Sequence, residues 1–371
     1  MFGELFLNYI RDNRIVIYGT GYNGIYTLQY LKANCIDIEG FADIKAEIEA
    51  YSEYGYPCKR ISDYKDKDEL MIIVTPYVDN IVICKSIEAL GFKKVVPWKD
   101  MESLFALCRM RNMDKNLRSV LNTNSLLKNT YIGNRCFIVG TGPSILKQNL
   151  SLLKDEYVFT VNTGYKIKQF SCLKSNFHVF VDSMYFSQVN DCDDFAKELT
   201  DKLCNCERCF FPYTKSRKFI EKYGLKQKLN ISYIEEDLFE DWTDEDINFE
   251  QITPLTGTVV VTAVMLAIYM GFSEIYLLGC DCTDIFTSIG AKTKNNLMTT
   301  YSWDNEEKQQ KRLEQTLGCR PLEQIYRMQY LKFKNFRKIN SICKDKGIKL
   351  YDCTDEGLLD CVEKLNYTAV I

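Results

Sequence analysis

The stretch Phe137-Ile138-Val139-Gly140-Thr141-Gly142-Pro143-Ser144 decides how the second half of the chain is expected to fold. Three apolar residues with high β propensity run directly into Gly-x-Gly-Pro-Ser, which predicts a buried strand, a tight turn and a helix that begins at Pro143. The two glycines leave the backbone without Cβ atoms, so a ligand can approach it closely. Free amides at the helix start would bind an anion, and we expect a phosphate at residues 140–144. An ordinary strand-to-helix turn is the alternative.

Polar residues follow the other predicted strands of this half. Asn162, Asp182 and Asp281 come just after the predicted strands 156–161, 177–181 and 274–279. Thr256-Gly257-Thr258 precedes an apolar helix that runs to Met270, where a threonine can cap the helix and the glycine permits close approach. Ligands of open α/β sheets bind at the carboxyl ends of the strands. These residues and the glycine-rich turn therefore predict one nucleotide site at one edge of one sheet.

A second glycine-rich turn lies near the N-terminus. Residues 14–19 predict a strand, and Gly19-Thr20-Gly21-Tyr22-Asn23-Gly24 then matches the G-x-G-x-x-G pattern before a helix over 25–33. A strand over 36–42 ends at Asp43, at the distance where dinucleotide-binding proteins place an acid on the ribose hydroxyls. We expect a second nucleotide pocket without redox chemistry at Gly19, Gly21, Gly24 and Asp43. The alternative is a Rossmann-like domain that binds no nucleotide.

Strands alternate with helices along most of the 371-residue chain, which predicts parallel sheets of the α/β class. The pattern divides into two Rossmann-like parallel-sheet domains, over residues 1–98 and 131–371, joined by a helical connector over 99–130. Residues 284–303 are polar, and we expect a long loop there. Pro321 is expected to open a last long helix.

Composition argues against several classes of protein. The net charge is −3 without a long basic run, so nucleic acid is not an expected partner. No apolar run reaches the ~18 residues of a membrane span, and residues 1–13 lack the features of a signal peptide. We expect a cytoplasmic protein with at most peripheral membrane association, and a homo-oligomer is compatible with the sequence. The 16 cysteines lack zinc spacing, so we expect reduced thiols and no bound metal.

Residues from about 135 to 362 resemble a superfamily with three branches. These are the bacterial sialyltransferases of glycosyltransferase family 42, the motility-accessory-factor glycosylation proteins and the archaeal 6-hydroxymethylpterin diphosphokinases (MptE-like). The shared features are the turn at 140–144, Asn162, the helix start at 256–258 and Gly279-x-Asp281. The resemblance implies a Rossmann-like domain that binds a cytidine or adenine nucleotide at the carboxyl edge of its sheet. The first domain resembles, in a generic way, the small Rossmann-like modules of bacterial nucleotide-sugar proteins.

The resemblance also implies roles for individual residues. The donor phosphate would be held by Gly140, Thr141, Gly142 and Ser144. The nucleotide and sugar would be lined by Asn162 and Asp182, and the base or ribose would be contacted by Thr256, Gly257 and Thr258. Asp281 would face the reacting centre. Two positions depart from the sialyltransferases. Thr283 stands where they have a tyrosine, and no histidine follows His178, so their histidine base is absent. We expect His178 to be structural and Asp281 to act as the base or to orient the ligand, supported by Asp182.

The resemblance therefore implies a glycosyltransferase of bacterial surface-glycan assembly. It would transfer an acidic, sialic-acid-like sugar from a CMP-activated donor to a glycan acceptor, without a required cofactor. One alternative is diphosphoryl transfer from ATP to a pterin-like alcohol, with Mg²⁺ on Asp182 or Asp281. Another is a nucleotide-binding protein without catalytic activity. The sugar, the acceptor, the linkage and the oligomeric state stay open.

Overall fold

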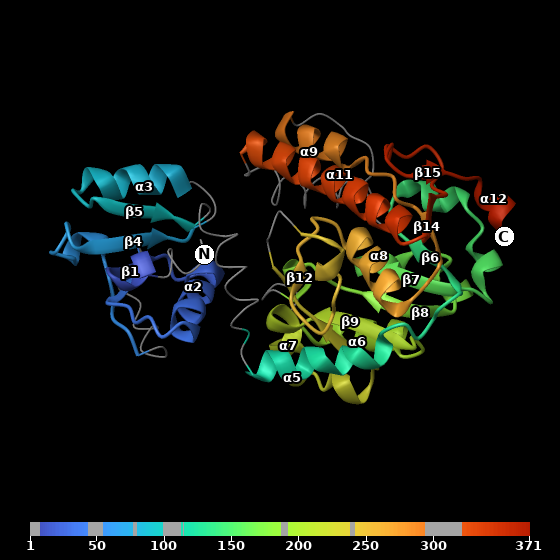
Figure 1. The fold of residues 1–371 in the computed structure, drawn as a ribbon, viewed down its shortest axis with the longest axis horizontal. Coiled ribbons are helices and arrows are strands. Elements are labelled where there is room, and N and C mark those ends of the chain that lie inside the picture. Colours follow the sequence, from blue (N-terminus) through green and yellow to red (C-terminus); the bar gives the residue numbers. More distant parts are fainter. Residues whose placement is uncertain are drawn as a thin grey trace. The chain divides into compact units, whose positions relative to one another are not determined.

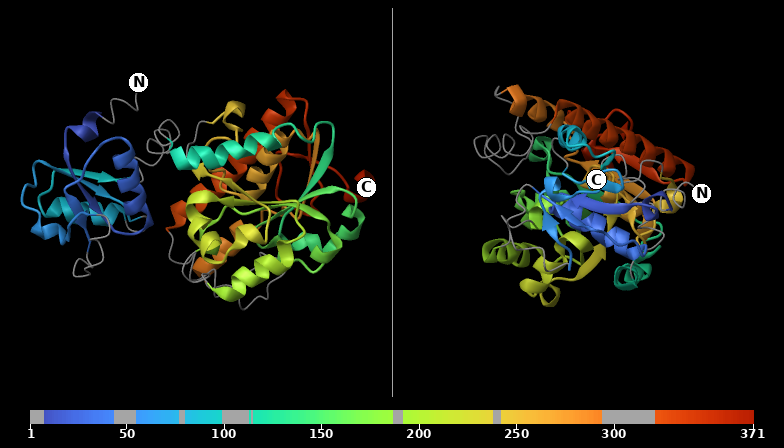
Figure 2. Two further views of the ribbon diagram at one scale, coloured as in Figure 1. Left: turned by 90° about the horizontal axis from the view of Figure 1, so that it is seen from below. Right: turned by 90° about the vertical axis from the view of Figure 1, so that its left-hand side faces the viewer.

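The computed structural model describes residues 8–43, 55–76, 80–98, 113, 115–186, 192–237, 242–293 and 321–371. The chain forms two compact units, with the boundary between Lys115 and Asn116. Figures 1 and 2 show a sheet with helices in each unit, and the strand pairs among the described residues are all parallel, which confirms the α/β class. Of the connector expected over 99–130, residues 99–112 and 114 lie outside the described residues. Its remainder from Asn116 onward belongs to the second unit.

The first unit contains a five-stranded sheet in the order β3-β2-β1-β4-β5. Its elements are β1 (Arg14–Tyr18), α2 (Tyr22–Ala33), β2 (Gly40–Ala42), β3 (Cys58–Lys59), β4 (Leu70–Val74), α3 (Asn80–Ala89) and β5 (Lys94–Pro97). Successive side chains of a strand point to opposite faces. Ile15 and Ile17 of β1 belong to the core that contains Leu28 of α2, whereas Val16 belongs to the core that contains Ile87 of α3. The two helices therefore cover opposite faces of the sheet (Figure 1).

The strand expected over 36–42 and the loop expected over 284–303 differ from the structure. The strand expected over 36–42 is confined to β2, because the Ile36 amide still donates to the carbonyl of Leu31 (2.9 Å) and closes the end of α2. The first half of the loop expected over 284–303 is the helix α9 (Asp284–Thr293), and residues 294–303 lie outside the described residues. Helix α9 packs on the last long helix, so tertiary contact stabilises a helix that its polar sequence does not indicate.

The second unit contains an eight-stranded sheet in the order β10-β9-β8-β7-β6-β13-β14-β15. Its strands are β6 (Arg135–Val139), β7 (Tyr157–Val161), β8 (Ser175–Val179), β9 (Arg208–Pro212), β10 (Ile231–Ile234), β13 (Glu274–Leu278), β14 (Lys349–Asp352) and β15 (Glu363–Lys364). Its helices are α5 (Lys115–Asn122), α6 (Asp193–Leu203), α7 (Tyr213–Lys222), α8 (Val259–Met270), α9, α11 (Leu322–Asp345) and α12 (Tyr367–Val370). A separate two-stranded ladder joins β11 (Glu236–Asp237) to β12 (Thr253–Pro254).

The core of the second unit forms around α8. This helix is apolar on all sides, is buried from Val260 to Met270 and packs on β6 and β7. On another part of the sheet, Leu199 of α6 and Phe219 of α7 share a core with Phe211 of β9. Helices thus lie on both faces of the sheet (Figure 2). None of the described helices is long and apolar enough to cross a membrane.

The order of strands sets the position of a candidate ligand site. From β6 the chain builds outward through β7, β8, β9 and β10, and it then returns to place β13 on the other side of β6. The carboxyl ends of β6 and β13 are therefore a topological switch point, where the connecting chains diverge and leave room for a ligand.

Candidate functional site

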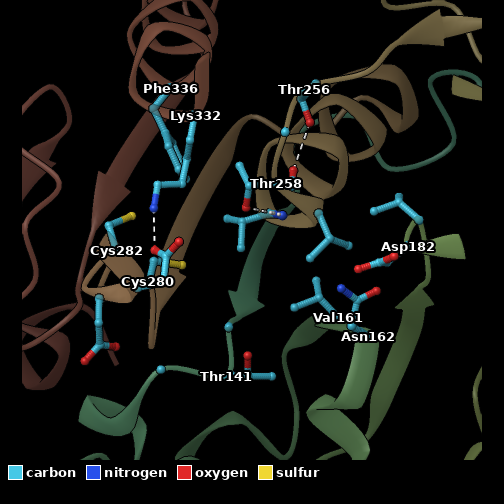
Figure 3. A pocket seen from close by; sticks show the side chains of 18 of the residues that line it. Thr141, Val161, Asn162, Asp182, Thr256, Thr258, Cys280, Cys282, Lys332 and Phe336 are labelled. Carbon is cyan, nitrogen blue, oxygen red and sulfur yellow. Dashed lines mark hydrogen bonds and ion pairs between the residues drawn. The ribbon is translucent and has the colours of Figure 1, made fainter. Parts of the chain in front are cut away.

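A cavity of about 380 Å³ opens at the carboxyl ends of β6 and β13. Its lining includes most of the residues predicted for the nucleotide site, namely Gly140, Thr141, Gly142, Asn162, Asp182, Thr256, Gly257, Thr258 and Asp281. Figure 3 shows Asn162 and Asp182 on one side of this cavity and Lys332 and Phe336 on the other. Pro143 and Ser144, which were predicted with the others, are not among the described residues that line it. The strand ends thus converge as the sequence predicts.

Asp281 is fixed by the glycine-rich turn after β6. The Ser144 amide donates to Asp281 Oδ1 (3.0 Å) and the Ser144 hydroxyl donates to Asp281 Oδ2 (2.7 Å). Burial raises the pKa of Asp281, although both hydrogen bonds from Ser144 act in the opposite direction. The sequence predicts that Ser144 binds a phosphate. In the structure, its amide and hydroxyl instead donate to the carboxylate of Asp281.

Gly142 has a different physical role from the one expected. A Cβ atom at this position would lie 1.9 Å from Asp281 Oδ2 and 2.7 Å from the backbone oxygen of Gly279. Its own amide donates to the Gly279 carbonyl (2.9 Å), which ties the turn after β6 to the turn after β13. The missing side chain therefore makes room for Asp281 and for a neighbouring strand end, in addition to any ligand in the cavity.

The helix expected to begin at Pro143 is a single 3₁₀ segment over Pro143–Lys147. Gln148 follows in an extended conformation, and the Ile145 amide bonds back to the Gly142 carbonyl (3.2 Å). A segment this short has few aligned peptide dipoles, so it provides little of the positive field of a long helix. The helix dipole therefore gives less support to the predicted phosphate site than a long helix would, and phosphate binding here stays a prediction.

His178 supports the turn that carries Asn162. Its Nε2 lies 2.8 Å from the backbone oxygen of Asn162 and its Nδ1 lies 2.7 Å from the hydroxyl of Thr160. A carbonyl oxygen only accepts, so Nε2 carries the proton and Nδ1 accepts from Thr160. The side chain is completely buried, which lowers the pKa of His178 to about 3 and keeps the ring neutral. His178 is a structural residue, as expected.

Asn162 has an unusual backbone and an unpaired side-chain atom. Its φ is 44°, in the left-handed region that asparagine tolerates better than most residues. Its Oδ1 is buried and has no hydrogen-bond partner, while the residue lines the cavity. An unpaired buried acceptor costs free energy, so a donor from a ligand would stabilise this position.

Glu236 also lines the cavity, and the sequence analysis did not identify it. It is 7% exposed, and burial raises the pKa of Glu236 to about 7. Its Oε1 lies 2.6 Å from the Thr262 hydroxyl, which lies 3.1 Å from the Thr256 hydroxyl. Glu236 sits in a two-residue strand within a polar stretch, so local sequence carries no signal that this acid is buried.

Two lysines line the cavity, and neither was predicted. Lys332 of α11 is 8% exposed in its side chain and pairs with Asp284 Oδ1, whose other oxygen accepts from Gln329 (2.8 Å). Lys215 of α7 donates to the carbonyl of Val181 (3.4 Å). The carboxylates of the lining can accept hydrogen bonds from hydroxyls, and the two ammonium groups can bind an anionic group of the same ligand. Within the described ranges, no group of three or more His, Cys, Asp or Glu side chains is arranged to hold a metal ion.

The first unit has a smaller cavity of about 310 Å³ at its own switch point, lined by Gly19, Thr20, Gly21, Asn23, Asp43, Thr75 and Pro76. Asp43 Oδ2 accepts from both the amide (3.0 Å) and the hydroxyl (2.5 Å) of Thr20, so the predicted acid also holds the glycine-rich turn. A Cβ atom at Gly24 would lie 2.0 Å from the Gly19 carbonyl oxygen. Gly24 therefore allows the helix to pack closely on the strand, and nucleotide binding here stays a prediction.

The fold and the larger cavity define a Rossmann-like α/β protein with a candidate ligand site at the switch point of a parallel sheet. Residues 110–285 match the model of a family described as 6-hydroxymethylpterin diphosphokinase MptE-like. The match spans a little under half of the chain and includes the strands from β6 to β13. It supports the MptE-like branch of the resemblance and indicates a related transferase-like or kinase-like function. No curated protein matches the chain.

Proposed function

We propose that the second unit is a nucleotide-dependent transferase that moves an acidic sugar from a CMP-activated donor to a glycan acceptor. The observation that carries this proposal is the convergence of Asn162, Asp182 and Asp281 on one cavity at the switch point. A sugar nucleotide presents hydroxyls and a phosphate to such a site. The carboxylates accept from the hydroxyls, and Lys215 and Lys332 favour the anionic groups.

Asp281 is the candidate base for this transfer. Each carboxylate oxygen has two lone pairs, so the bonds from Ser144 leave one on each oxygen for the substrate. Its raised pKa brings the carboxylate closer to the basicity that proton abstraction needs. In the proposed step Asp281 takes the proton of an acceptor hydroxyl, the hydroxyl oxygen bonds to the anomeric carbon, and the bond from that carbon to the phosphate oxygen breaks. CMP leaves with the electron pair.

Diphosphoryl transfer from ATP to a pterin-like alcohol is the second candidate, and the family match favours it. This chemistry uses Mg²⁺ to neutralise the phosphates, and Asp182 and Asp281 are the cavity carboxylates that would hold it. A third candidate, a binding protein without turnover, shares the same cavity.

One set of assays separates these candidates. The protein is incubated with a CMP-activated acidic sugar and a glycan acceptor in EDTA, and separately with ATP, Mg²⁺ and 6-hydroxymethylpterin. We expect release of CMP in EDTA. AMP formation only with ATP and Mg²⁺ would support the diphosphokinase, and nucleotide binding without product in either mixture would support the binding protein.

Variants of two residues test the assignment of the base. We expect Asp281→Asn to lower turnover by about 10²–10⁴-fold, the usual contribution of a general base. His178→Gln is the matched control, because His178 is completely buried. Collapse of turnover in the histidine variant, with the Asp281 variant near wild type, would contradict the assignment.

A further inference from the structure

Among the described residues that line the cavity, Glu236 is a buried acid for which the proposed transfer has no role. Its contacts form a chain of three short distances. Oε1 lies 2.6 Å from the Thr262 hydroxyl, the Thr262 hydroxyl lies 3.1 Å from the Thr256 hydroxyl, and the Thr256 hydroxyl lies 2.9 Å from the carbonyl oxygen of Thr258. Thr256 and Thr262 are almost completely buried, so water does not compete for these groups.

The number of hydrogens in this chain favours a protonated Glu236. A carbonyl oxygen only accepts, so the hydroxyl hydrogen of Thr256 goes to Thr258. Thr262 has one hydrogen for two contacts, one to Thr256 and one to Glu236. All three contacts are hydrogen bonds only when Glu236 supplies the third hydrogen from Oε1. With an ionised Glu236, two hydroxyl hydrogens serve three contacts, and one of the three lacks a hydrogen bond.

The charged surroundings are consistent with a neutral acid. Lys215 of α7 is the nearby cation, but its ammonium group donates to the carbonyl of Val181. Glu235, the neighbour in sequence, accepts from the amide of Thr214 and adds negative charge. The cavity also contains Asp182, Asp281 and Asp284 against Lys215 and Lys332, so ionisation of Glu236 would make the lining more negative. A buried acid in such a place is more stable with its proton.

We propose that Glu236 is a neutral carboxylic acid that selects the nucleobase, with Oε2 accepting from the exocyclic amino group of cytosine or adenine. This rests on the proposed function, since it places the nucleotide in the same cavity. The apolar residues Leu255, Val259 and Val260 line the cavity around the start of α8 and can provide apolar contact for a base. Uracil and hypoxanthine carry a carbonyl oxygen where cytosine and adenine carry the amino group. Two facing acceptors repel, so a site built for the amino group rejects them.

The neutral form also explains how an anion enters an acidic cavity. With a neutral Glu236, a nucleotide phosphate meets three carboxylates and two ammonium groups of the lining. When Glu236 ionises, the number of carboxylates rises to four while the number of ammonium groups stays at two. Binding of the nucleotide then requires uptake of a proton by Glu236. Affinity is full below the pKa of Glu236 of about 7 and falls as the pH rises through it.

The test compares wild type with Glu236→Gln. A glutamine can direct its NH₂ group to Thr262 and its oxygen to the cavity, so it imitates the neutral acid at every pH. Glu245→Gln removes a charge from an exposed site and is the matched control. CMP, UMP, AMP and IMP are titrated by calorimetry at pH 6 and pH 8.5 into the full chain. Infrared spectra at both pH values report the band of a protonated carboxyl group.

We expect CMP or AMP to bind wild type up to about 30-fold more tightly at pH 6 than at pH 8.5, from one proton and a pKa of about 7. Glu236→Gln should show little of this difference, and Glu245→Gln should show all of it. UMP and IMP should bind about tenfold or more weakly than their amino counterparts. A preference for CMP supports the glycosyl donor, and a preference for AMP supports the diphosphokinase.

Three results would overturn the proposal. The first concerns the infrared spectra at pH 6. If wild type shows no protonated-carboxyl band beyond those of Glu236→Gln, Glu236 is ionised. The second is tight binding of UMP or IMP, or equal pH dependence in wild type and Glu236→Gln, which would refute base selection while the nucleotide site stands. The third is a carboxyl band without binding of any nucleotide, which would refute the proposed function and, with it, the role of Glu236.

Discussion

Gly142→Ala tests whether the glycine-rich turn is built around Asp281. The added Cβ would lie 1.9 Å from Asp281 Oδ2 and 2.7 Å from the backbone oxygen of Gly279. The carboxylate can move away only by giving up its bonds from the amide and hydroxyl of Ser144. Hydrogen bonds to charged groups contribute about 1.5–3 kcal/mol each. Because Asp281 would regain part of this from water, we expect the free energy of unfolding to fall by about 3 kcal/mol.

Thermal unfolding followed by circular dichroism measures this effect. A loss of about 3 kcal/mol lowers the Tm of a unit of this size by about 6–12 °C. Gly21→Ala is the matched control, since it adds the same methyl group to the other glycine-rich turn, where a Cβ would have no neighbour within 4 Å. A Tm for Gly142→Ala equal to those of wild type and Gly21→Ala would refute the role assigned to Gly142.

Two further predictions concern His178 and Gly24. Burial lowers the pKa of His178 to about 3, below its value in the unfolded chain, so the unfolded chain binds the proton first. As the pH falls from about 6.5 to 3, the free energy of unfolding should therefore decrease more steeply for wild type than for His178→Gln. The difference in slope should be up to about 1.4 kcal/mol per pH unit. Urea melts at pH 7, 5.5 and 4 check this, and parallel slopes would contradict it. Gly24→Ala places a Cβ 2.0 Å from the Gly19 carbonyl and should destabilise the first unit by about 1–3 kcal/mol, whereas Gly21→Ala should not. Equal melting temperatures for these two variants would show that α2 does not need the close packing.

The sequence by itself determined the α/β class and the sheet edge at which the candidate site lies. Apolar residues that run into Gly140 and Gly19 mark the strands that end at the two switch points, and this signal is local to a few residues. Asn162, Asp182 and Asp281 could be placed at one edge because parallel strands align their carboxyl ends. The structural role expected for His178 rested on an early place in a strand over 177–181, whereas β8 spans Ser175–Val179 and places His178 near its end. These conclusions need the pattern of the chain and the direction of the strands, but no knowledge of which strands are neighbours.

Only the tertiary structure decided what these residues contact. Ser144 and Asp281 are 137 residues apart, and they meet because β13 returns to lie beside β6. The partner of Gly142 is for this reason a carboxylate of the protein, which no local pattern indicates. Lys332 and Glu236 reach the cavity from a long helix and from a two-residue strand, in stretches whose sequence is typical of surface or core. Burial, and with it the proton on Glu236, depends on how distant segments pack, which is why the sequence predicted the edge of the site but not its charge.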